Sequence, residues 1–486
     1  MDLEKALWYL KRATNVFDSA AVLYDACRDR EEAGWRFADV DIQVHNDRDV
    51  LHLLERHSEE LCEWLRSVFE GRGTTLESIR YDGASTCAGI TEAFQTLQRE
   101  LPAVTWACPA AAWYLLQAID QAISTKVPAL LRQFSECDLH ALNQNQRSGM
   151  SKVFPKMPSP FYPLVPEGLR LPAPGQVTRS AANCLGSLAF FDGPESRIRI
   201  ISREPLWLDF RQDQVPKTAV ILPVARYDSE FPLRGPGEAS SAVGVFWVEA
   251  RESETYRRSI VEALREADRA GTAIALLPEL SGSPGVTDAI RRVASAGEFT
   301  SLRLIAAGSY HARRSRADER KDNVATVLDG QGNVLWRQGK REPFHLTLEQ
   351  AEGELPTGRH REWIAVNHPQ LLACTPIGGI AVMVCLDFVQ PEMLGDLCAL
   401  ACRWFLVPAC TPGLRGKFDR RLQDIGDLGG AIGAIANNPR ECKSSESRFR
   451  FYRPVGDRKL AFPEGEPRGP ACVVCDWRQG LDTESR

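Results

Sequence analysis

From about Thr218 onward, short apolar runs alternate with stretches of helical character, and this alternation limits the fold more than any other feature of the chain. The apolar runs include TAVILPVA, TAIALLPEL, LRLIAAGSY, IAVMVCLDF, WFLVPAC and GAIGAIANN, and helices are expected at about 253–270 and 284–296. Strands that are apolar along their whole length are typical of sheets whose faces are covered by helices. The pattern predicts an α/β domain.

The preceding part of the chain has a different character. Apolar residues recur near a 3.6-residue period at about 2–30, 47–70, 75–101 and 109–134, which predicts amphipathic helices. We expect an all-α domain over 1–148 and the α/β domain over 216–480. Between them, 149–215 contains seven prolines from Pro155 to Pro174, typical of an extended connector, followed by short strands expected in SRIRII and PLWLDF.

Composition excludes several classes of protein. The 486 residues are 44% hydrophobic and 25% charged, with a net charge of −5, so nothing indicates an obligatory nucleic-acid or anionic-membrane partner. The first residues mix charge with apolar side chains, unlike a signal peptide, and no apolar stretch is long enough to span a bilayer. We therefore expect a cytoplasmic protein whose fourteen cysteines are mostly reduced core thiols.

Three reactive residues stand at or just beyond the ends of predicted strands. Glu279 ends the run IALLPE, Lys340 follows NVLWRQG, and Cys385 ends IAVMVC. With these residues in this order the sequence resembles the nitrilase superfamily of carbon–nitrogen hydrolases. The segments KDNVATVLDGQGNVLWRQGK, CLDFVQPE, RWFLVPACTPG and GAIGAIANNP strengthen the resemblance, which covers roughly 216–450. It implies an α-β-β-α sandwich of the nitrilase type and a Glu-Lys-Cys triad.

The chemistry explains why these residue types are needed together. A free thiol titrates near 8.5, so Cys385 needs a base to become a nucleophile at neutral pH. Glu279 follows four apolar residues, and desolvation would raise its pKa toward the range useful for proton transfer. Lys340 would favour the thiolate and stabilise an oxyanion, with the backbone N–H of Leu386 as a second donor. A thioester intermediate and its hydrolysis by water follow from this arrangement.

The resemblance also implies a further active-site glutamate between the lysine and the cysteine. The segment TLEQAEGELPTG offers Glu349, Glu352 and Glu354. Glu352 is the preferred candidate because EGELPTG best resembles the family context, and a solvated acidic loop is the alternative. The sequence departs from the family pattern in two places that concern substrate positioning. The family often has a histidine and a leucine directly after the lysine, whereas here His345 and Leu346 follow several residues later. The family also often has an arginine soon after the Pro-Glu pair of CLDFVQPE, and this chain has none there.

No metal or cofactor is expected. Cys472 and Cys475 form a CxxC with no second pair, which favours strand packing over a zinc site. His52 and His57 are five residues apart and do not share a helix face. The charge-dense stretch 311–322 is interpreted as a solvated loop.

Two functions remain open. The first is an enzyme, an amidase-like hydrolase of a non-peptide carbon–nitrogen bond in an amide, nitrile or carbamoyl substrate. The alternative is a non-catalytic or partner-regulated assembly module in a signalling or defence system, whose helical domain recruits or senses a protein partner. A homodimer or higher homo-oligomer is expected in either case, through a helix at about 391–403 whose apolar residues exceed one buried stripe: Met393, Leu394, Leu397, Leu400 and Ala401.

Overall fold

The computed structural model of the chain describes most of its secondary structure. The described residues are 3–27, 44, 46–70, 83–104, 106–133, 152–155, 185, 188–191, 197–211, 215–223, 230–235, 244–314, 320–352, 354–400, 402–429, 431–438, 448–452 and 471–477. His45, Ala401 and most of the proline-rich connector lie outside these residues. The chain divides into two compact units, one formed by 1–194 with 200–202 and 399–401, and the other by the remaining residues.

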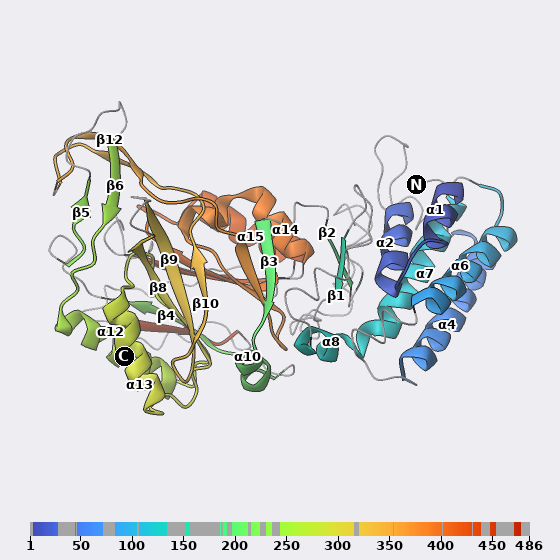
Figure 1. Cartoon of the computed structure of the whole chain (residues 1–486), viewed down its shortest axis with the longest axis horizontal. Coiled ribbons are helices and arrows are strands. Elements are labelled where there is room, and N and C mark those ends of the chain that lie inside the picture. Colours follow the sequence, from blue (N-terminus) through green and yellow to red (C-terminus); the bar gives the residue numbers. More distant parts are fainter. Residues whose placement is uncertain are drawn as a thin grey trace. The chain divides into compact units, whose positions relative to one another are not determined.

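Helices dominate the first unit (Figure 1). The central helix α7 (Ala107–Ser124) contacts α2, α4 and α6, and most of its side chains are buried, as expected for a helix that is apolar on nearly every face. An antiparallel pair of short strands, β1 with β2, also belongs to this unit, and the N–H of Leu188 donates to buried Asp120 of α7 at 2.7 Å. The other elements are α1 (Leu3–Leu10), α2 (Val16–Cys27), α4 (Arg48–Glu70), α6 (Gly83–Glu100), α8 (Val127–Gln133), β1 (Lys152–Pro155) and β2 (Leu188–Phe191).

The second unit contains, within its described residues, two six-stranded sheets and one four-stranded sheet. In the first large sheet the order is β10-β9-β8-β7-β4-β18, and β4, β7 and β8 run parallel. Its strands are β4 (Thr218–Leu222), β7 (Ile274–Leu276), β8 (Leu304–Arg313), β9 (Lys321–Asp329), β10 (Val334–Gly339) and β18 (Ala471–Cys475). Helix α12 (Glu254–Arg269) packs on β4 and β18, and α13 (Pro284–Ser295) packs on α12.

The second large sheet has the order β17-β16-β15-β14-β13-β3, with β14, β15 and β16 parallel. Its strands are β3 (Ile198–Ser202), β13 (Gln370–Cys374), β14 (Gly379–Val382), β15 (Cys402–Ala409), β16 (Ile432–Asn437) and β17 (Phe449–Tyr452). Helix α15 (Lys417–Gly429) packs on β16 and β17, while β15 and β16 contact β4, β7 and β8 of the first sheet. The two sheets therefore face each other, with helices on the outer sides.

The small sheet, β11-β12-β6-β5, contacts β8 of the first large sheet through β6, and its strands β5, β6 and β12 are labelled at the upper left of Figure 1. It consists of β5 (Leu233–Arg234), β6 (Gly244–Val248), β11 (His345–Leu348) and β12 (Gly358–Glu362). Strand β12 pairs with β6 in parallel and with β11 in the antiparallel sense. This sheet forms the wall of the cavity described below.

The predicted strands and helices of the α/β part are confirmed, and three local predictions were wrong. PLWLDF is not a strand but lies in helix α10 (Glu204–Asp209), because Pro205 occupies the first turn, where its missing N–H costs nothing. The helices expected at 2–30 and 109–134 are each divided into two, α1 with α2 and α7 with α8. Asn15 caps the start of α2 because its Oδ1 accepts from the N–H of Asp18 at 3.0 Å, and Asp18 Oδ2 in turn accepts from the N–H of Thr14 at 3.0 Å.

Helix α14 (Pro391–Ala399) is shorter than expected, and its apolar side chains are already covered. Met393, Leu394, Leu397 and Leu400 are all buried within the single chain. The exposed apolar surface on which the expected pairing rested is therefore not found among the described residues of this helix. None of the helices within the described ranges combines the length and the apolarity needed to cross a bilayer.

Candidate active site

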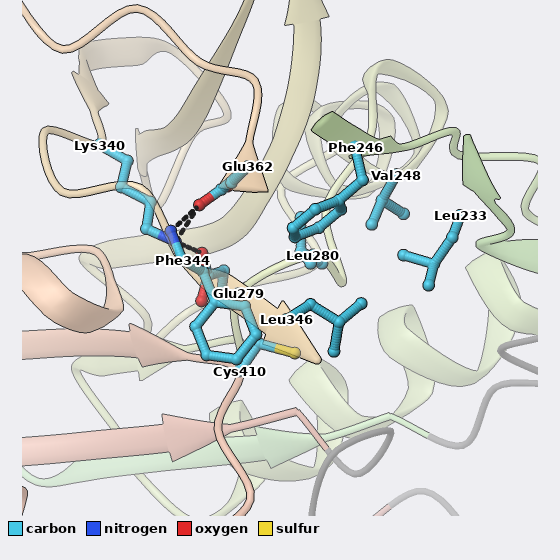
Figure 2. Close-up of a pocket in the computed structure, with 10 residues that line it drawn as sticks. All are labelled: Leu233, Phe246, Val248, Glu279, Leu280, Lys340, Phe344, Leu346, Glu362 and Cys410. Carbon is cyan, nitrogen blue, oxygen red and sulfur yellow. Dashed lines mark hydrogen bonds and ion pairs between the residues drawn. The ribbon is translucent and has the colours of Figure 1, made fainter. Parts of the chain in front are cut away.

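The three strand ends predicted to carry reactive groups bring two of those groups into direct contact. Lys340, which follows β10, points its ammonium between two carboxylates (Figure 2). Its Nζ lies 2.7 Å from Glu279 Oε1, after β7, and 2.7 Å from Glu362 Oε2, at the end of β12. All three side chains are buried. A buried ammonium between two carboxylates is a cluster whose protonation states depend on one another.

Glu362, and not the predicted Glu352, is the second glutamate in contact with Lys340. Glu352 is only partly buried, forms a backbone bridge with Leu355, and is not among the described residues that line the cavity beside Lys340. Glu349 is exposed, and Glu354 pairs with Arg234 at 2.5 Å. Because Glu362 makes the contact with Lys340, the geometry favours Glu362 over these three candidates as the second carboxylate.

Several donors hold Glu362 in its ionised form. His311 Nε2 lies 2.8 Å from Glu362 Oε1, Asn323 Nδ2 donates to the same oxygen at 2.8 Å, and the N–H of Phe344 donates to Oε2 at 2.8 Å. The N–H of Val248 donates to His311 Nδ1 at 2.8 Å, so the imidazole proton belongs on Nε2, facing the carboxylate. Glu362 is thus fixed by groups from four segments of the chain.

Glu279 has fewer donors. Its Oε1 accepts from Lys340 and from Asn323 Nδ2 at 2.9 Å, while Oε2 is buried with no hydrogen-bond partner among the described residues. An unpartnered carboxylate oxygen in an apolar interior favours the protonated form. Oε2 is therefore the atom at which Glu279 can accept a proton.

The two carboxyl groups differ in pKa for this reason. Burial raises the pKa of Glu279, and the nearby Lys340 only partly offsets this. Burial acts in the same direction on Glu362, but Lys340 and the hydrogen bond from His311 outweigh it and lower the pKa of Glu362 below its usual range. Burial would lower the pKa of Lys340, yet the charges of Glu279 and Glu362 raise it well above its ordinary value. Because the two pKa values differ in this way, Glu362 remains an anion while Glu279 can accept and release a proton.

Cys385 lies at a sharp turn after β14. Its φ is +52°, a left-handed conformation that costs a non-glycine residue free energy and is found at functional sites. The turn continues as the 3-10 helix η6 (Cys385–Val389). The Cys385 thiol donates to the carbonyl oxygen of Cys410, with Sγ and the oxygen 3.8 Å apart. Burial, followed by the charge of Glu279, raises the pKa of the Cys385 thiol well above its ordinary value, so the resting thiol keeps its proton.

Two contacts from the second large sheet position the backbone of Glu279. Its N–H donates to the carbonyl of Ala409 at 3.3 Å, and Asn438 Nδ2 donates to its carbonyl at 2.6 Å. The next residue, Leu280, has φ +57°. This loop passes close to Gly308, where a Cβ would lie 2.6 Å from the carbonyl oxygen of Pro278. Any side chain at position 308 would therefore push the Glu279 loop away.

A third buried carboxylate, Asp387, connects the cysteine turn to the loop that follows Lys340. It accepts from the N–H groups of Arg341, at 3.0 Å, and Glu342, at 2.7 Å. Burial raises the pKa of Asp387 to about 7, although these two N–H groups oppose the shift. Because Arg341 follows Lys340 and Asp387 follows Cys385 by two residues, this contact fixes the separation of two triad members.

Leu386, the expected second oxyanion donor, lies in η6 at a partly exposed position, and the donor role of its N–H stays a prediction. No group of three or more His, Cys, Asp or Glu residues suited to a metal ion occurs within the described part of the chain. Cys472 and Cys475 lie on β18, which pairs with β4.

Sequence reasoning missed Glu362, His311, Asn323 and Asp387, and the interpretation of 311–322 as a solvated loop was wrong at both ends, because His311 lies on β8 with its side chain buried and Asp322 lies on β9. Only Glu362 had a usable signal. In the polar segment GRHRE, His360 and Glu362 are buried while Arg359 and Arg361 are exposed, so the strand alternates with its carboxylate inward. The other three act through contacts between distant segments, which a local pattern does not contain.

Comparison with known proteins gives weak likenesses. No family model matches the chain, and no curated protein matches it. Among solved structures, a mutant of the amidase from Nesterenkonia sp. AN1 with acrylamide added at its active-site cysteine has 16% sequence identity and a TM-score of 0.35, with 54% of this chain and 93% of that chain covered. The amidase from Nesterenkonia sp. has 17% identity and a TM-score of 0.36, with 53% and 89% covered. A further mutant, described as belonging to the nitrilase superfamily, has 16% identity and a TM-score of 0.36 over 53% and 89%. Similarity of this degree establishes neither fold family nor activity for this chain.

Proposed function

We propose that the second unit is an α-β-β-α sandwich of the nitrilase type that hydrolyses a non-peptide carbon–nitrogen bond through a thioester on Cys385. The observation that carries this proposal is the buried Lys340 ammonium held at 2.7 Å by both Glu279 and Glu362, with Cys385 at a strained turn close enough for the charge of Glu279 to raise the pKa of its thiol. In a cluster with only a structural role, a buried carboxylate oxygen without a hydrogen-bond partner and a cysteine in a strained backbone conformation would both lower the stability of the fold.

The reaction would proceed in two halves. Cys385 Sγ attacks the carbonyl carbon of an amide while its proton moves to Glu279 Oε2, and the carbonyl electrons move to oxygen, where Lys340 stabilises the negative charge. The tetrahedral intermediate collapses, the C–N bond breaks, and the leaving amine takes the proton from Glu279. Water then attacks the thioester as Glu279 accepts its proton, and the thiol is regenerated when Glu279 returns it. The sum is amide plus water giving acid plus amine.

Each carboxylate has one role in this scheme. Glu279, with its raised pKa, transfers protons, and Glu362, with its lowered pKa, stays ionised and keeps Lys340 charged and in place. A nitrile or carbamoyl substrate would use the same groups, and the amide is the form in which the proposal is tested. The cytoplasmic location, the homodimer and a protein partner for the helical unit stay predictions.

The test is ammonia release by the full chain and by Cys385→Ala. The variant removes one small atom group at the end of a strand, so we expect it to keep the circular-dichroism spectrum of the wild type and to release no ammonia. Cys374→Ala, another buried thiol outside the cavity lining, is the matched control and should retain activity. Substantial release of ammonia by Cys385→Ala would contradict the assignment of the nucleophile.

A further inference from the structure

An irregularity in strand β8 places His311 beside the charged cluster. Residues 306–309 of β8 pair with 325–327 of β9, four residues against three, so β8 carries a bulge at this point. One extra residue exchanges the two faces of a strand from there on. The bulge therefore turns His311, rather than Tyr310, toward the face on which its cross-strand partner Asn323 lies.

The two carboxylates of the cluster share two of their partners. Lys340 Nζ lies 2.7 Å from Glu279 and 2.7 Å from Glu362 (Figure 2). Asn323 Nδ2 donates to Glu279 at 2.9 Å and to Glu362 at 2.8 Å. The imidazole of His311 breaks this symmetry, because its Nε2 lies 2.8 Å from Glu362 Oε1. Among the described side chains that hydrogen-bond to these carboxylates, His311 is the one that distinguishes Glu362 from Glu279.

The second nitrogen of His311 determines which form of the ring is present. The N–H of Val248 donates to Nδ1 at 2.8 Å, so Nδ1 carries a lone pair and the proton lies on Nε2. A doubly protonated ring would direct its Nδ1–H at the N–H of Val248. The neutral ring with its proton on Nε2 is therefore the form that satisfies both contacts, and its side chain has no exposed surface.

Glu362 has a full set of donors when His311 is in place. Its Oε1 accepts from His311 and Asn323, and its Oε2 accepts from Lys340 and from the N–H of Phe344. A carboxylate accepts about four hydrogen bonds, so the side chain cannot rotate without losing one of them. Burial raises the pKa of Glu362, but the charge of Lys340 and the hydrogen bond from His311 lower it below its usual range.

His311 also connects this cluster to the small sheet. The side chain of Val248 lines the cavity beside Lys340, together with Phe246 and Leu346 of the same sheet (Figure 2). The backbone N–H of Val248 holds His311 at the same time. The orientation of the imidazole is thus set by β6, and the imidazole in turn sets the orientation of Glu362 on β12.

We infer that His311 is a positioning residue of the site: as a neutral imidazole that donates from Nε2, it fixes Glu362, and through Glu362 it holds Lys340 where the oxyanion develops. This inference rests on the proposed hydrolase function and adds to it a residue that acts at one remove from the reacting atoms. The lysine charge meets a negative oxygen only along the reaction path. Loss of His311 should therefore lower kcat and leave KM nearly unchanged.

Two substitutions separate the two contacts of the imidazole in the full chain. The amide nitrogen of a glutamine can reach the place of Nε2 and donate to Glu362, whereas a shorter asparagine can only accept from Val248 near the place of Nδ1. With butyramide as the probe and ammonia release as the assay, His311→Asn should lower kcat at least about 10-fold and keep KM within about 2-fold. His311→Gln should keep kcat within about 3-fold of the wild type. The inference is overturned if His311→Asn keeps its kcat, or if His311→Gln loses as much.

A second buried histidine provides the matched control. His360 lies on β12 two residues before Glu362, and its Nε2 lies 2.8 Å from the carbonyl oxygen of Pro356, outside the cluster. His360→Asn also removes a buried imidazole, and it should keep kcat within about 2-fold. An equal loss of kcat in His360→Asn and His311→Asn would overturn the inference, because the effect would then be one of burial in general.

A double variant tests whether His311 acts through Glu362. In the background of Glu362→Gln, His311→Asn should lower kcat by less than about 2-fold further, because the anion that it positions is already absent. A full additional loss of about 10-fold would contradict this and would assign His311 an independent effect.

A measurement without turnover separates this inference from the hydrolase proposal. In ¹⁵N NMR of the full chain labelled at its eight histidines, the signals that disappear in His311→Asn should show an unprotonated Nδ1 and a protonated Nε2 at neutral pH. An imidazolium or the opposite tautomer would overturn the inference. If the predicted tautomer is found but the wild type releases ammonia from no amide, the hydrolase proposal fails and the fixing of Glu362 by His311 stands.

Discussion

Lys340→Met should destabilise the fold and also remove turnover, because the lysine charge has two functions. In the wild type the ammonium lies 2.7 Å from each of two buried carboxylates. Removing one partner of a buried ion pair costs about 3–5 kcal/mol, since the remaining charge is left without compensation. That is a large share of the roughly 5–15 kcal/mol that holds a typical domain folded. Loss of an oxyanion donor should in addition lower kcat on the order of 10²-fold or more.

The pH dependence of the variant gives a second readout. Without Lys340, the charges of Glu279 and Glu362 repel each other in a buried site, and at least one carboxyl pKa must rise above its unfolded value. A raised carboxyl pKa means that the folded state binds the proton more tightly than the unfolded state. The stability gained from that proton is complete below the unfolded pKa and is lost as the pH rises through the folded pKa. The destabilisation of Lys340→Met relative to wild type should therefore grow as the pH is raised from acid to neutral.

Urea unfolding at several pH values measures both effects. Lys217→Met is the matched control, because Lys217 forms a part-exposed pair with Asp476 at 3.3 Å, and such pairs contribute about 1 kcal/mol or less. Adding Glu362→Gln to Lys340→Met should cost less than the sum of the two single changes by about 0.5–3 kcal/mol. The reasoning is refuted if Lys340→Met costs no more than Lys217→Met, or if the double variant loses the full sum.

Two further changes test the carboxylates. Glu362→Gln should lower kcat on the order of 10²-fold because the anion that holds Lys340 is removed. Glu352→Gln should keep nearly full ammonia release. If Glu352→Gln loses activity and Glu362→Gln keeps it, Glu352 is the second active-site carboxylate. Asp387, whose pKa burial raises to about 7, should make the wild type lose stability as the pH rises from about 4 to about 7, by on the order of 4 kcal/mol. Asp387→Asn should therefore show a smaller fall in unfolding free energy over that interval, and an unchanged pH profile would contradict the burial argument.

The order of strands and helices in the α/β part could be predicted because continuous apolar runs are a local signal. Cys385, Lys340 and Glu279 could be named because each stands at the end of a predicted strand and because, in this order and context, they resemble the Glu-Lys-Cys triad of the nitrilase superfamily. The structure brings Lys340 and Glu279 together, and Cys385 lies close enough for the charge of Glu279 to raise the pKa of its thiol. The local sequence was sufficient to predict a site residue where that residue stands at the end of a strand.

Glu362 could not be found in the same way. It lies on β12, whose residues Gly358–Glu362 are almost all polar or charged, so the strand has no apolar pattern. Its place beside Lys340 follows from the pairing of β12 with β6 and β11, which is set by contacts between distant segments. PLWLDF failed for another reason, since the proline at its start favours a first helical turn over a strand.

The central claim is that Glu279 activates Cys385 as the nucleophile, and alkylation by chloroacetamide tests it most directly. Chloroacetamide is a small neutral amide that alkylates thiols, and its rate of reaction at each of the fourteen cysteines can be followed by peptide mass spectrometry. Because the resting thiol is protonated, reaction at Cys385 requires a base in place. The account predicts that Cys385 is modified first, that Glu279→Gln slows this at least about 100-fold, and that Glu352→Gln does not. If another cysteine reacts first, or if Cys385 reacts equally fast in Glu279→Gln, the account is contradicted.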